Sequence, residues 1–204
     1  MTDIYYIGGS PCSGKSTVAE IIAQKYGIHY YKVDDYFESF TIKGAKLHYP
    51  ICTKQTELSP EQIWMRDSVL QNEEEFQYYH EIFEFIQTDL LKYNEPRPII
   101  TEGAAYLPEL MRQHNVTKDR YIAITPTKDF QISRYKKREW VPFVLEGCSD
   151  TQKAFENWMD RDLLFAQEVR HQCQVLNYSS ILIDGTIAVD KIVSLVCAHF
   201  NLEA

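Results

Sequence analysis

Short apolar segments alternate with longer amphipathic segments along most of this chain. The segments with the length and composition of buried strands are residues 4–8, 28–33, 98–101, 120–125 and 181–184. Apolar residues recur every three or four positions over residues 15–26, 107–114, 128–138, 151–175 and 189–200, which predicts helices. Alternating strands and helices favour an α/β fold in which three layers are built around a five-stranded parallel sheet.

Residues 38–96 interrupt this alternation and are expected to form an inserted helical lobe. Residues 38–59 have mixed polarity and are predicted to be irregular. Ser59 and Pro60 have the pattern of a helix start, with a helix expected over 60–71 and a second over 73–93. The second helix carries one apolar face, which we interpret as core: Phe76, Tyr79, Phe83, Ile86 and Leu90.

The length and composition indicate one soluble domain over residues 1–204. The formal net charge of -8 disfavours broad binding to nucleic acid or to anionic membranes. No apolar run is long enough to span a bilayer, and no signal peptide is seen, so a cytoplasmic location is expected. The five cysteines include no C-x-x-C pair, which indicates neither a disulfide framework nor a zinc site.

The strongest motif lies between the first strand and the first helix. It matches G-x-x-x-x-G-K-[ST], the Walker A or phosphate-binding loop, and comprises Gly9, Ser10, Pro11, Cys12, Ser13, Gly14, Lys15, Ser16 and Thr17. Its glycines let backbone N–H groups point inward at an anion, and the helix that follows adds its positive end. Lys15 is expected to reach the β- and γ-phosphates of ATP, and the Ser16 hydroxyl to bind Mg²⁺.

Acidic residues follow two further strands. Asp34, Asp35 and Tyr36 come after the second strand, and Glu102 and Gly103 end the third. Because ligands of open α/β sheets bind outside the carboxyl ends of the strands, we expect these residues on the same rim as the phosphate loop. Asp184 ends the last strand, where we interpret it as a turn residue.

With these motifs the sequence resembles the small P-loop kinases of the nucleoside-monophosphate-kinase fold. This group includes gluconate, shikimate and uridine kinases and chloramphenicol phosphotransferase. The resemblance implies the strand order 2-3-1-4-5. It also implies that an acid after strand two, Asp34 or Asp35, is the base for an accepting hydroxyl, and that Glu102 supports Mg²⁺.

The same resemblance implies a lid over about residues 134–160. In it Arg134 and Arg138 would cover the nucleotide, with Arg138 acting in catalysis. Arg161 and Arg170 are further lid candidates. Gly185 and Thr186 resemble the turn that borders adenine.

The inserted lobe bears on the acceptor. Between residues 57 and 95 there are ten acids and only two basic residues, Arg66 and Lys92. Phosphorylated acceptors usually need clustered arginines, so this balance favours an uncharged or cationic hydroxyl compound. The acids fit equally well with a solvated face that contacts no acceptor. The candidate acceptor contacts are Arg66, Asp34, Asp35, Tyr36, Glu102 and Gly103. The sequence therefore predicts an ATP- and Mg²⁺-dependent small-molecule kinase. A nucleotide-binding ATPase or switch without an acceptor, or a nucleoside or nucleotide kinase, remains an alternative.

Overall fold

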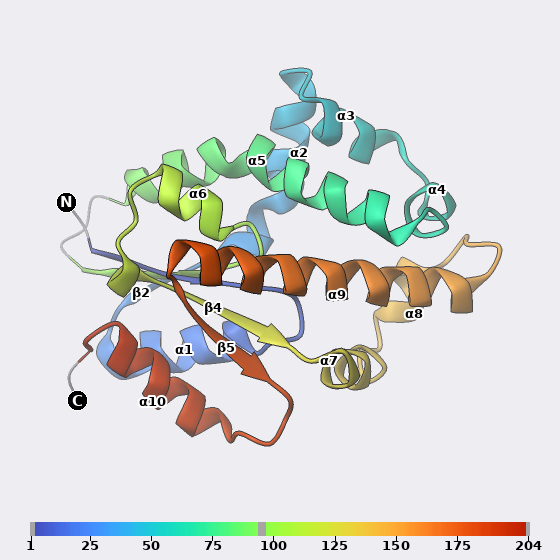
Figure 1. Ribbon diagram of the computed structural model, residues 1–204. Coiled ribbons are helices and arrows are strands. Elements are labelled where there is room, and N and C mark those ends of the chain that lie inside the picture. Colours follow the sequence, from blue (N-terminus) through green and yellow to red (C-terminus); the bar gives the residue numbers. More distant parts are fainter. Residues whose placement is uncertain (1–2, 94–96, 203–204) are drawn as a thin grey trace.

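A central five-stranded parallel sheet organises the computed structural model, which describes residues 3–93 and 97–202 (Figure 1). The strands are β1 (Ile4–Gly8), β2 (His29–Lys32), β3 (Ile99–Glu102), β4 (Tyr121–Pro126) and β5 (Ser179–Ile183). Their order in the sheet is β2-β3-β1-β4-β5, and every neighbouring pair is parallel. This confirms both the α/β class and the strand order implied by the resemblance.

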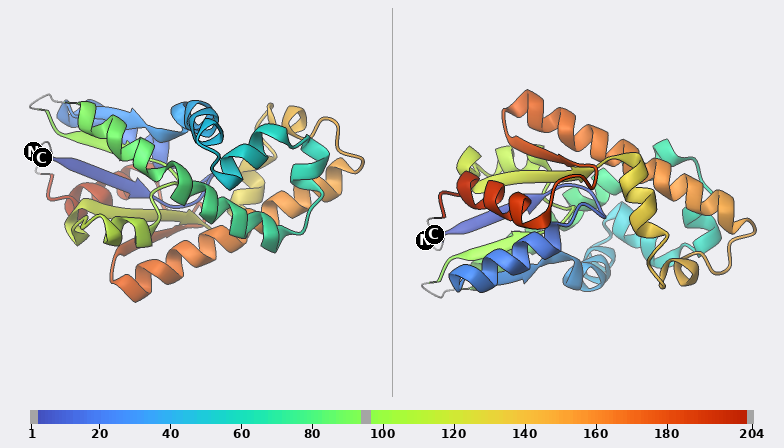
Figure 2. Two further views of the ribbon diagram at one scale, coloured as in Figure 1. Left: turned by 90° about the horizontal axis from the view of Figure 1, so that it is seen from above. Right: turned by 90° about the horizontal axis from the view of Figure 1, so that it is seen from below.

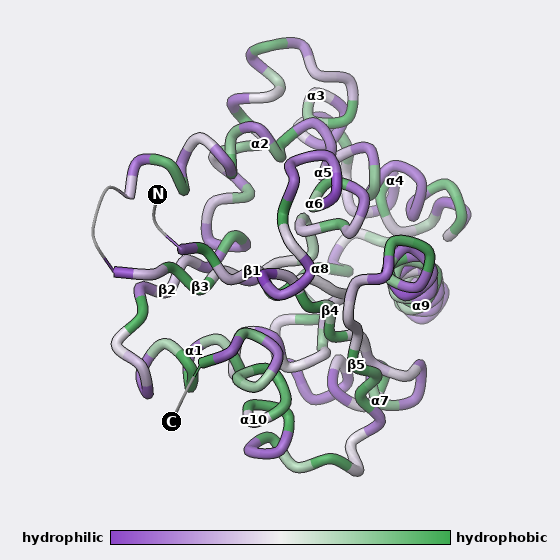
Figure 3. Tube along the Cα trace, turned by 60° about the vertical axis from the view of Figure 1, so that its left-hand side comes forward, coloured by the Kyte–Doolittle hydropathy of each residue, from purple (hydrophilic) through white to green (hydrophobic). Residues whose placement is uncertain are grey.

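Helices cover both faces of the sheet and complete the three layers (Figure 1). One face is covered by α1 (Lys15–Tyr26) and α10 (Val189–His199), with a core that includes Val18, Ile22 and Val196. The other face is covered by α5 (Ser68–Lys92), α6 (Pro108–Gln113) and α9 (Thr151–Leu176). Figure 3 shows hydrophilic and hydrophobic residues alternating along the helices, as expected of helices that bury one side.

The strand register places the carboxyl ends of β1, β2 and β3 level with one another. Glu102 lies opposite Ile7 of β1 on one side and Lys32 of β2 on the other. The strands therefore finish together, and their carboxyl ends point toward the end of the molecule where α4 (Pro60–Trp64), α7 (Lys128–Tyr135) and α8 (Val141–Val144) lie (Figure 2).

The prediction of an irregular segment over residues 38–59 is wrong. This stretch forms α2 (Phe37–Lys46) and α3 (Pro50–Glu57). Pro50 occupies the first turn of α3, where the missing N–H costs nothing. The two carboxylate oxygens of Glu81 on α5 accept the backbone N–H groups of Ile51 and Cys52, both at 2.8 Å, which caps α3 from a distant part of the chain.

The helix expected over residues 60–71 is also shorter than predicted. Ser59 forms the anticipated capping box, but α4 ends at Trp64. Asp67 then caps α5 by accepting the N–H groups of Val69 and Leu70. The amide of Gln71 donates to the backbone carbonyl oxygens of Trp64 and Arg66, so it stabilises the break between the two helices.

The remaining expectations hold with small shifts. The apolar face of α5 is confirmed as core, since Tyr79, Phe83, Ile86 and Leu90 are buried. Residues 139–151, expected to be a loop, contain the short helix α8. The expected lobe boundary at residue 96 lies outside the described residues, and none of the described helices is long and apolar enough to cross a membrane.

Candidate active site

The phosphate loop has the backbone geometry that its sequence requires. Gly9 and Gly14 have positive φ values of 115° and 84°, and Cys12 shares this left-handed region at 60°. A Cβ added at Gly9 would lie 1.9 Å from the carbonyl oxygen of Ile124, so only glycine fits between the loop and β4. At Gly14 nothing lies within 4 Å of such a Cβ, and the loop is open on that side.

Several polar groups of this loop have no hydrogen-bond partner among the described residues. The hydroxyls of Ser10 and Ser13 are buried and make no hydrogen bond. Helix α1 starts at Lys15 with no side-chain cap. Lys15 is only 7% exposed, and its ammonium donates to the carbonyl oxygen of Ser10 at 2.8 Å. Unmatched donors at a helix N-terminus beside a buried cation fit the phosphates of a nucleotide.

A cavity, here called the nucleotide cavity, extends from this loop to α7, to α10 and to the turn that follows β5. Its volume is about 370 Å³. Its lining residues are Cys12, Ser13, Gly14, Thr17, Val18, Phe130, Arg134, Lys137, Arg138, Ile183, Gly185, Ile187, Val189 and Ile192. Gly185 is therefore placed as predicted, whereas Thr186 does not line the cavity. Thr186 instead donates from its N–H and hydroxyl to Asp184, which confirms Asp184 as a turn residue.

The predicted lid arginines differ from each other in environment. Arg134 and Arg138 are exposed, line the nucleotide cavity and have no carboxylate partner in the described part of the chain. They stack instead on aromatic rings: Arg134 on Phe130, and Arg138 on Tyr135 and Trp140. Arg161 and Arg170 lie on α9, outside the predicted lid range. The largely buried side chain of Arg161 pairs with Glu75, and Arg170 donates to the Thr125 hydroxyl of β4.

Of the two acids after β2, the structure brings only Asp34 to the phosphate loop. Asp35 pairs with Lys32 at 3.5 Å. The Asp34 carboxylate has no ion pair or hydrogen bond among the described residues and lies next to Gly103, Lys15 and Glu102. Desolvation by the surrounding walls and repulsion from Glu102 raise the pKa of Asp34, although its side chain remains accessible to solvent.

Glu102 is 1% exposed, and no basic side chain of the described residues pairs with it. The phenol of Tyr30 donates to its Oε1 at 3.0 Å. A buried carboxylate without a counter-charge is unfavourable, so this position fits a bound cation. The described residues contain no group of three His, Cys, Asp or Glu that could hold a metal. Mg²⁺ bound beside phosphates needs only one or two protein ligands, and Ser16 and Glu102 fit that role.

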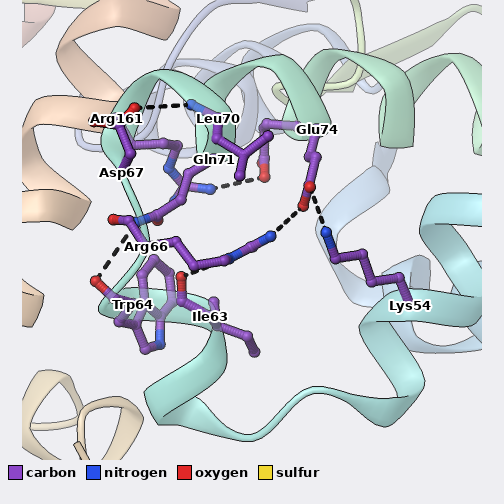
Figure 4. A network of polar contacts seen from close by, with 10 residues as sticks. Lys54, Ile63, Trp64, Arg66, Asp67, Leu70, Gln71, Glu74 and Arg161 are labelled. Carbon is purple, nitrogen blue, oxygen red and sulfur yellow. Dashed lines mark hydrogen bonds and ion pairs between the residues drawn. The ribbon is translucent and has the colours of Figure 1, made fainter. Parts of the chain in front are cut away.

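The predicted acceptor contacts Tyr36 and Arg66 line cavities other than the one at the phosphate loop. Tyr36 stacks on Tyr31 with ring centroids 4.8 Å apart and borders a small separate cavity of about 190 Å³. Arg66 lies in the helical lobe, where it donates to Glu74 and to the carbonyl oxygen of Ile63 (Figure 4).

Arg66 lines a second cavity of about 240 Å³, here called the lobe pocket. Its lining residues are Gln55, Leu58, Ile63, Trp64, Arg66, Gln71, Glu74, Glu75 and Arg161. The basic groups at this pocket are paired: Lys54 and Arg66 with Glu74, and Arg161 with Glu75 and Asp162 at 2.7 Å each. Burial opposes ionisation of Glu74, but its bonds to Lys54 and Arg66 outweigh burial and lower its pKa.

A buried polar cluster connects the lobe pocket with the phosphate loop. Glu75 accepts from the Tyr79 hydroxyl. Asp162, beside Arg161, accepts from the Tyr135 hydroxyl at 2.8 Å, and Tyr135 belongs to the same hydrophobic cluster as Cys12 of the loop. Sequence reasoning missed this cluster and Tyr30. The alternation of β2 could have placed Tyr30 on the same face as Glu102 once the strand order was given.

Comparison with known proteins supports the fold alone. No family model matches the sequence, and no curated protein matches it. The chain is similar in structure to TT1252 from Thermus thermophilus, with 14% identity and a TM-score of 0.55 over 100% of this chain and 99% of the other. It is also similar to a deoxyadenosine kinase from M. mycoides with bound dATP, with 16% identity and a TM-score of 0.51 over 98% of this chain and 100% of the other. An uncharacterized protein from Eubacterium ventriosum ATCC 27560 has 17% identity and a TM-score of 0.50 over 99% of this chain and 100% of its own.

At these identities the shared feature is architecture. The strand order, the helices on both faces and the phosphate loop at the end of β1 make this the fold of the small P-loop kinases.

Proposed function

We propose that the protein is a Mg²⁺-dependent kinase that transfers the terminal phosphoryl group of ATP to a hydroxyl of a small, non-phosphorylated metabolite. The observation that carries this proposal is the pairing of an anion cradle with a free carboxylate. The loop from Gly9 to Thr17 offers unmatched donors and Lys15, while the Asp34 carboxylate beside it has no partner among the residues that the structure describes. A cytoplasmic location is part of this proposal.

The residues of the chain divide the reaction between them. Asp34 orients the acceptor hydroxyl and takes its proton as the new bond forms between that oxygen and the γ-phosphorus. The bond from the γ-phosphorus to the bridging oxygen breaks, and ADP leaves. Lys15 neutralises the phosphate oxygens, and Arg138 with Arg134 covers the charge that spreads in the transition state. Ser16 and Glu102 would hold Mg²⁺, which supplies further charge neutralisation at the β- and γ-oxygens.

The raised pKa of Asp34 suits this role. A carboxylate whose pKa is shifted upward binds a proton more strongly, so it accepts one more readily from a hydroxyl near neutral pH. Gly103 permits the close approach of Val33, the residue before Asp34, because an added Cβ would lie 3.0 Å from Cβ of Val33.

The lobe pocket supports the assignment of a non-phosphorylated acceptor. Arg66 and Arg161 are the arginines that line it, and carboxylates already neutralise both. A phosphate group on the acceptor would have to displace Glu74 or Glu75 to obtain the charge-assisted bonds it needs. A neutral, hydroxyl-bearing molecule meets paired donors and acceptors without that cost.

The test is an acceptor panel of sugars, polyols, nucleosides and their monophosphates with ATP and Mg²⁺, followed by ADP release and by direct detection of the phosphorylated product. We expect turnover with a non-phosphorylated member. Asp34→Asn should keep the affinity for ATP and reduce transfer by about 10²-fold or more. ADP release at one rate with every acceptor and without any would make the protein an ATPase, and efficient turnover of monophosphates would overturn the acceptor class.

A further inference from the structure

Tyr30 of β2 lies at the point where the cation of the proposed reaction would bind. In the sheet Tyr30 is opposite Ile100 of β3, and Glu102 follows two residues later on the same face. A long side chain can reach such a diagonal neighbour. The Tyr30 hydroxyl does so, donating to Oε1 of Glu102 at 3.0 Å.

The same phenol also lies beside the phosphate loop. Ser16 lies in the first turn of α1, which begins at Lys15. Tyr30 is half-buried, and its ring packs against the core between the sheet and α1. Tyr30 and Glu102 therefore lie on the face of the sheet that α1 covers, and α1 carries Ser16, the other residue that fits Mg²⁺.

We propose that Tyr30 is a positioning residue of the magnesium site. Its hydroxyl occupies Oε1 of Glu102 and so directs the carboxylate, leaving Oε2 for the cation or for a water bound to the cation. Outer hydrogen bonds of this kind fix the orientation of metal-binding side chains, and their removal typically weakens metal binding by about 10–100-fold. This inference rests on the proposed function, because Glu102 is a metal ligand only there.

The structure separates the hydroxyl from the ring of Tyr30. The ring contributes to the core beside α1, whereas the oxygen serves Glu102 alone among the hydrogen bonds of the described residues. Tyr30→Phe therefore removes the proposed role and keeps the packing. Tyr26→Phe is the matched control, since the Tyr26 hydroxyl on α1 donates to the carbonyl oxygen of Leu202, at 3.5 Å, and makes no hydrogen bond to Glu102.

The experiment measures binding of a non-hydrolysable ATP analogue with and without Mg²⁺, and titrates Mg²⁺ and Mn²⁺ into the analogue complex. For Tyr30→Phe we expect the concentration of Mg²⁺ at half saturation to rise by about 10-fold. The Mg²⁺-free affinity for the analogue should stay unchanged. Tyr26→Phe should match the wild type in both measurements.

Two results would overturn the role of Tyr30 alone. One is a Mg²⁺ requirement that Tyr30→Phe leaves unchanged. The other is an equal loss of analogue affinity with and without Mg²⁺, which would show that the hydroxyl supports the loop and not the cation. If the wild type itself binds the analogue equally well in both conditions, the magnesium site of the proposed function fails as well.

Discussion

Arginine side chains in two regions of this protein differ in whether a carboxylate neutralises them. Around the nucleotide cavity, Arg134 and Arg138 stack on aromatic rings and have no carboxylate partner among the described residues. At the lobe pocket, Arg66 and Arg161 are bonded to glutamates. The first arrangement keeps positive charge available for an anionic ligand, and the second cancels it in advance. Under the proposed function, this difference assigns the phosphate groups of ATP to the first region and a non-phosphorylated acceptor to the second.

The largest effect should come from the one buried cation of the phosphate loop. Lys15→Ala should reduce kcat/KM for ATP by about 10³-fold, because no other group can replace its charge at the transferring phosphoryl group. Steady-state kinetics with the best acceptor would measure this. Lys25→Ala, at the exposed end of the same helix, is the control and should leave kcat/KM unchanged. A loss smaller than 10-fold would remove Lys15 from the reaction.

In the lobe, removing a paired cation should harm folding instead. Arg161→Met leaves Glu75 and Asp162 buried without their partner and should lower the free energy of unfolding by about 3 kcal/mol, as measured by urea denaturation. Lys128→Met breaks a pair with Asp160 in which both side chains are 49% exposed, and should cost at most about 1 kcal/mol. If the two variants lose equal stability, the buried cluster does not have the energetic role assigned here.

An unpaired arginine should show the reverse pattern. Arg138→Ala should reduce kcat by about 10²-fold, the smaller end for one donor to transition-state charge, with unchanged stability. Arg112→Ala, an exposed arginine on α6, serves as the control. Loss of stability in Arg138→Ala without loss of kcat would place Arg138 in the structural group and erase the contrast.

The smallest effect concerns Asp34 and pH. The pKa of Asp34 is higher in the folded protein than in the unfolded chain, so its contribution to stability is fully present below the ordinary pKa of aspartate. That contribution is lost as pH rises through the raised value. The melting temperature of Asp34→Asn should therefore gain on the wild type between acidic and neutral pH. Asp35→Asn loses the pair with Lys32 and should show no such gain.

The sequence predicted the parts of the fold that depend on local patterns. The strands, the phosphate loop and the amphipathic face of α5 each follow from residues close together in the chain. Residues 38–59 were missed because α3 is capped by Glu81 from a helix thirty residues away. A polar segment with a central proline gives no local sign of such a partner.

The site shows the same limit. Asp34 could be placed beside the phosphate loop by the rule for strand ends, but its separation from Asp35 depends on Lys32. Arg66 was expected to contact the acceptor, and its bond to Glu74 is visible only once α5 is placed beside it. The contact of Tyr30 with Glu102 depends on the register between β2 and β3, which the predicted strand order does not give. Tertiary pairing decided each of these, and periodicity carries no information about it.

The unmatched hydroxyls of Ser10 and Ser13 have a consequence for the lifetime of the protein. Under the proposed function, these two hydroxyls make hydrogen bonds only when the phosphates of ATP are bound. At a ligand concentration 100 times the dissociation constant, binding would add about 2.7 kcal/mol to the free energy of unfolding. Resistance to proteolysis should then rise with nucleotide supply, measurable as a longer half-life under protease with ATP than without it. The phosphate loop would then make the rate at which the protein is degraded depend on the concentration of ATP.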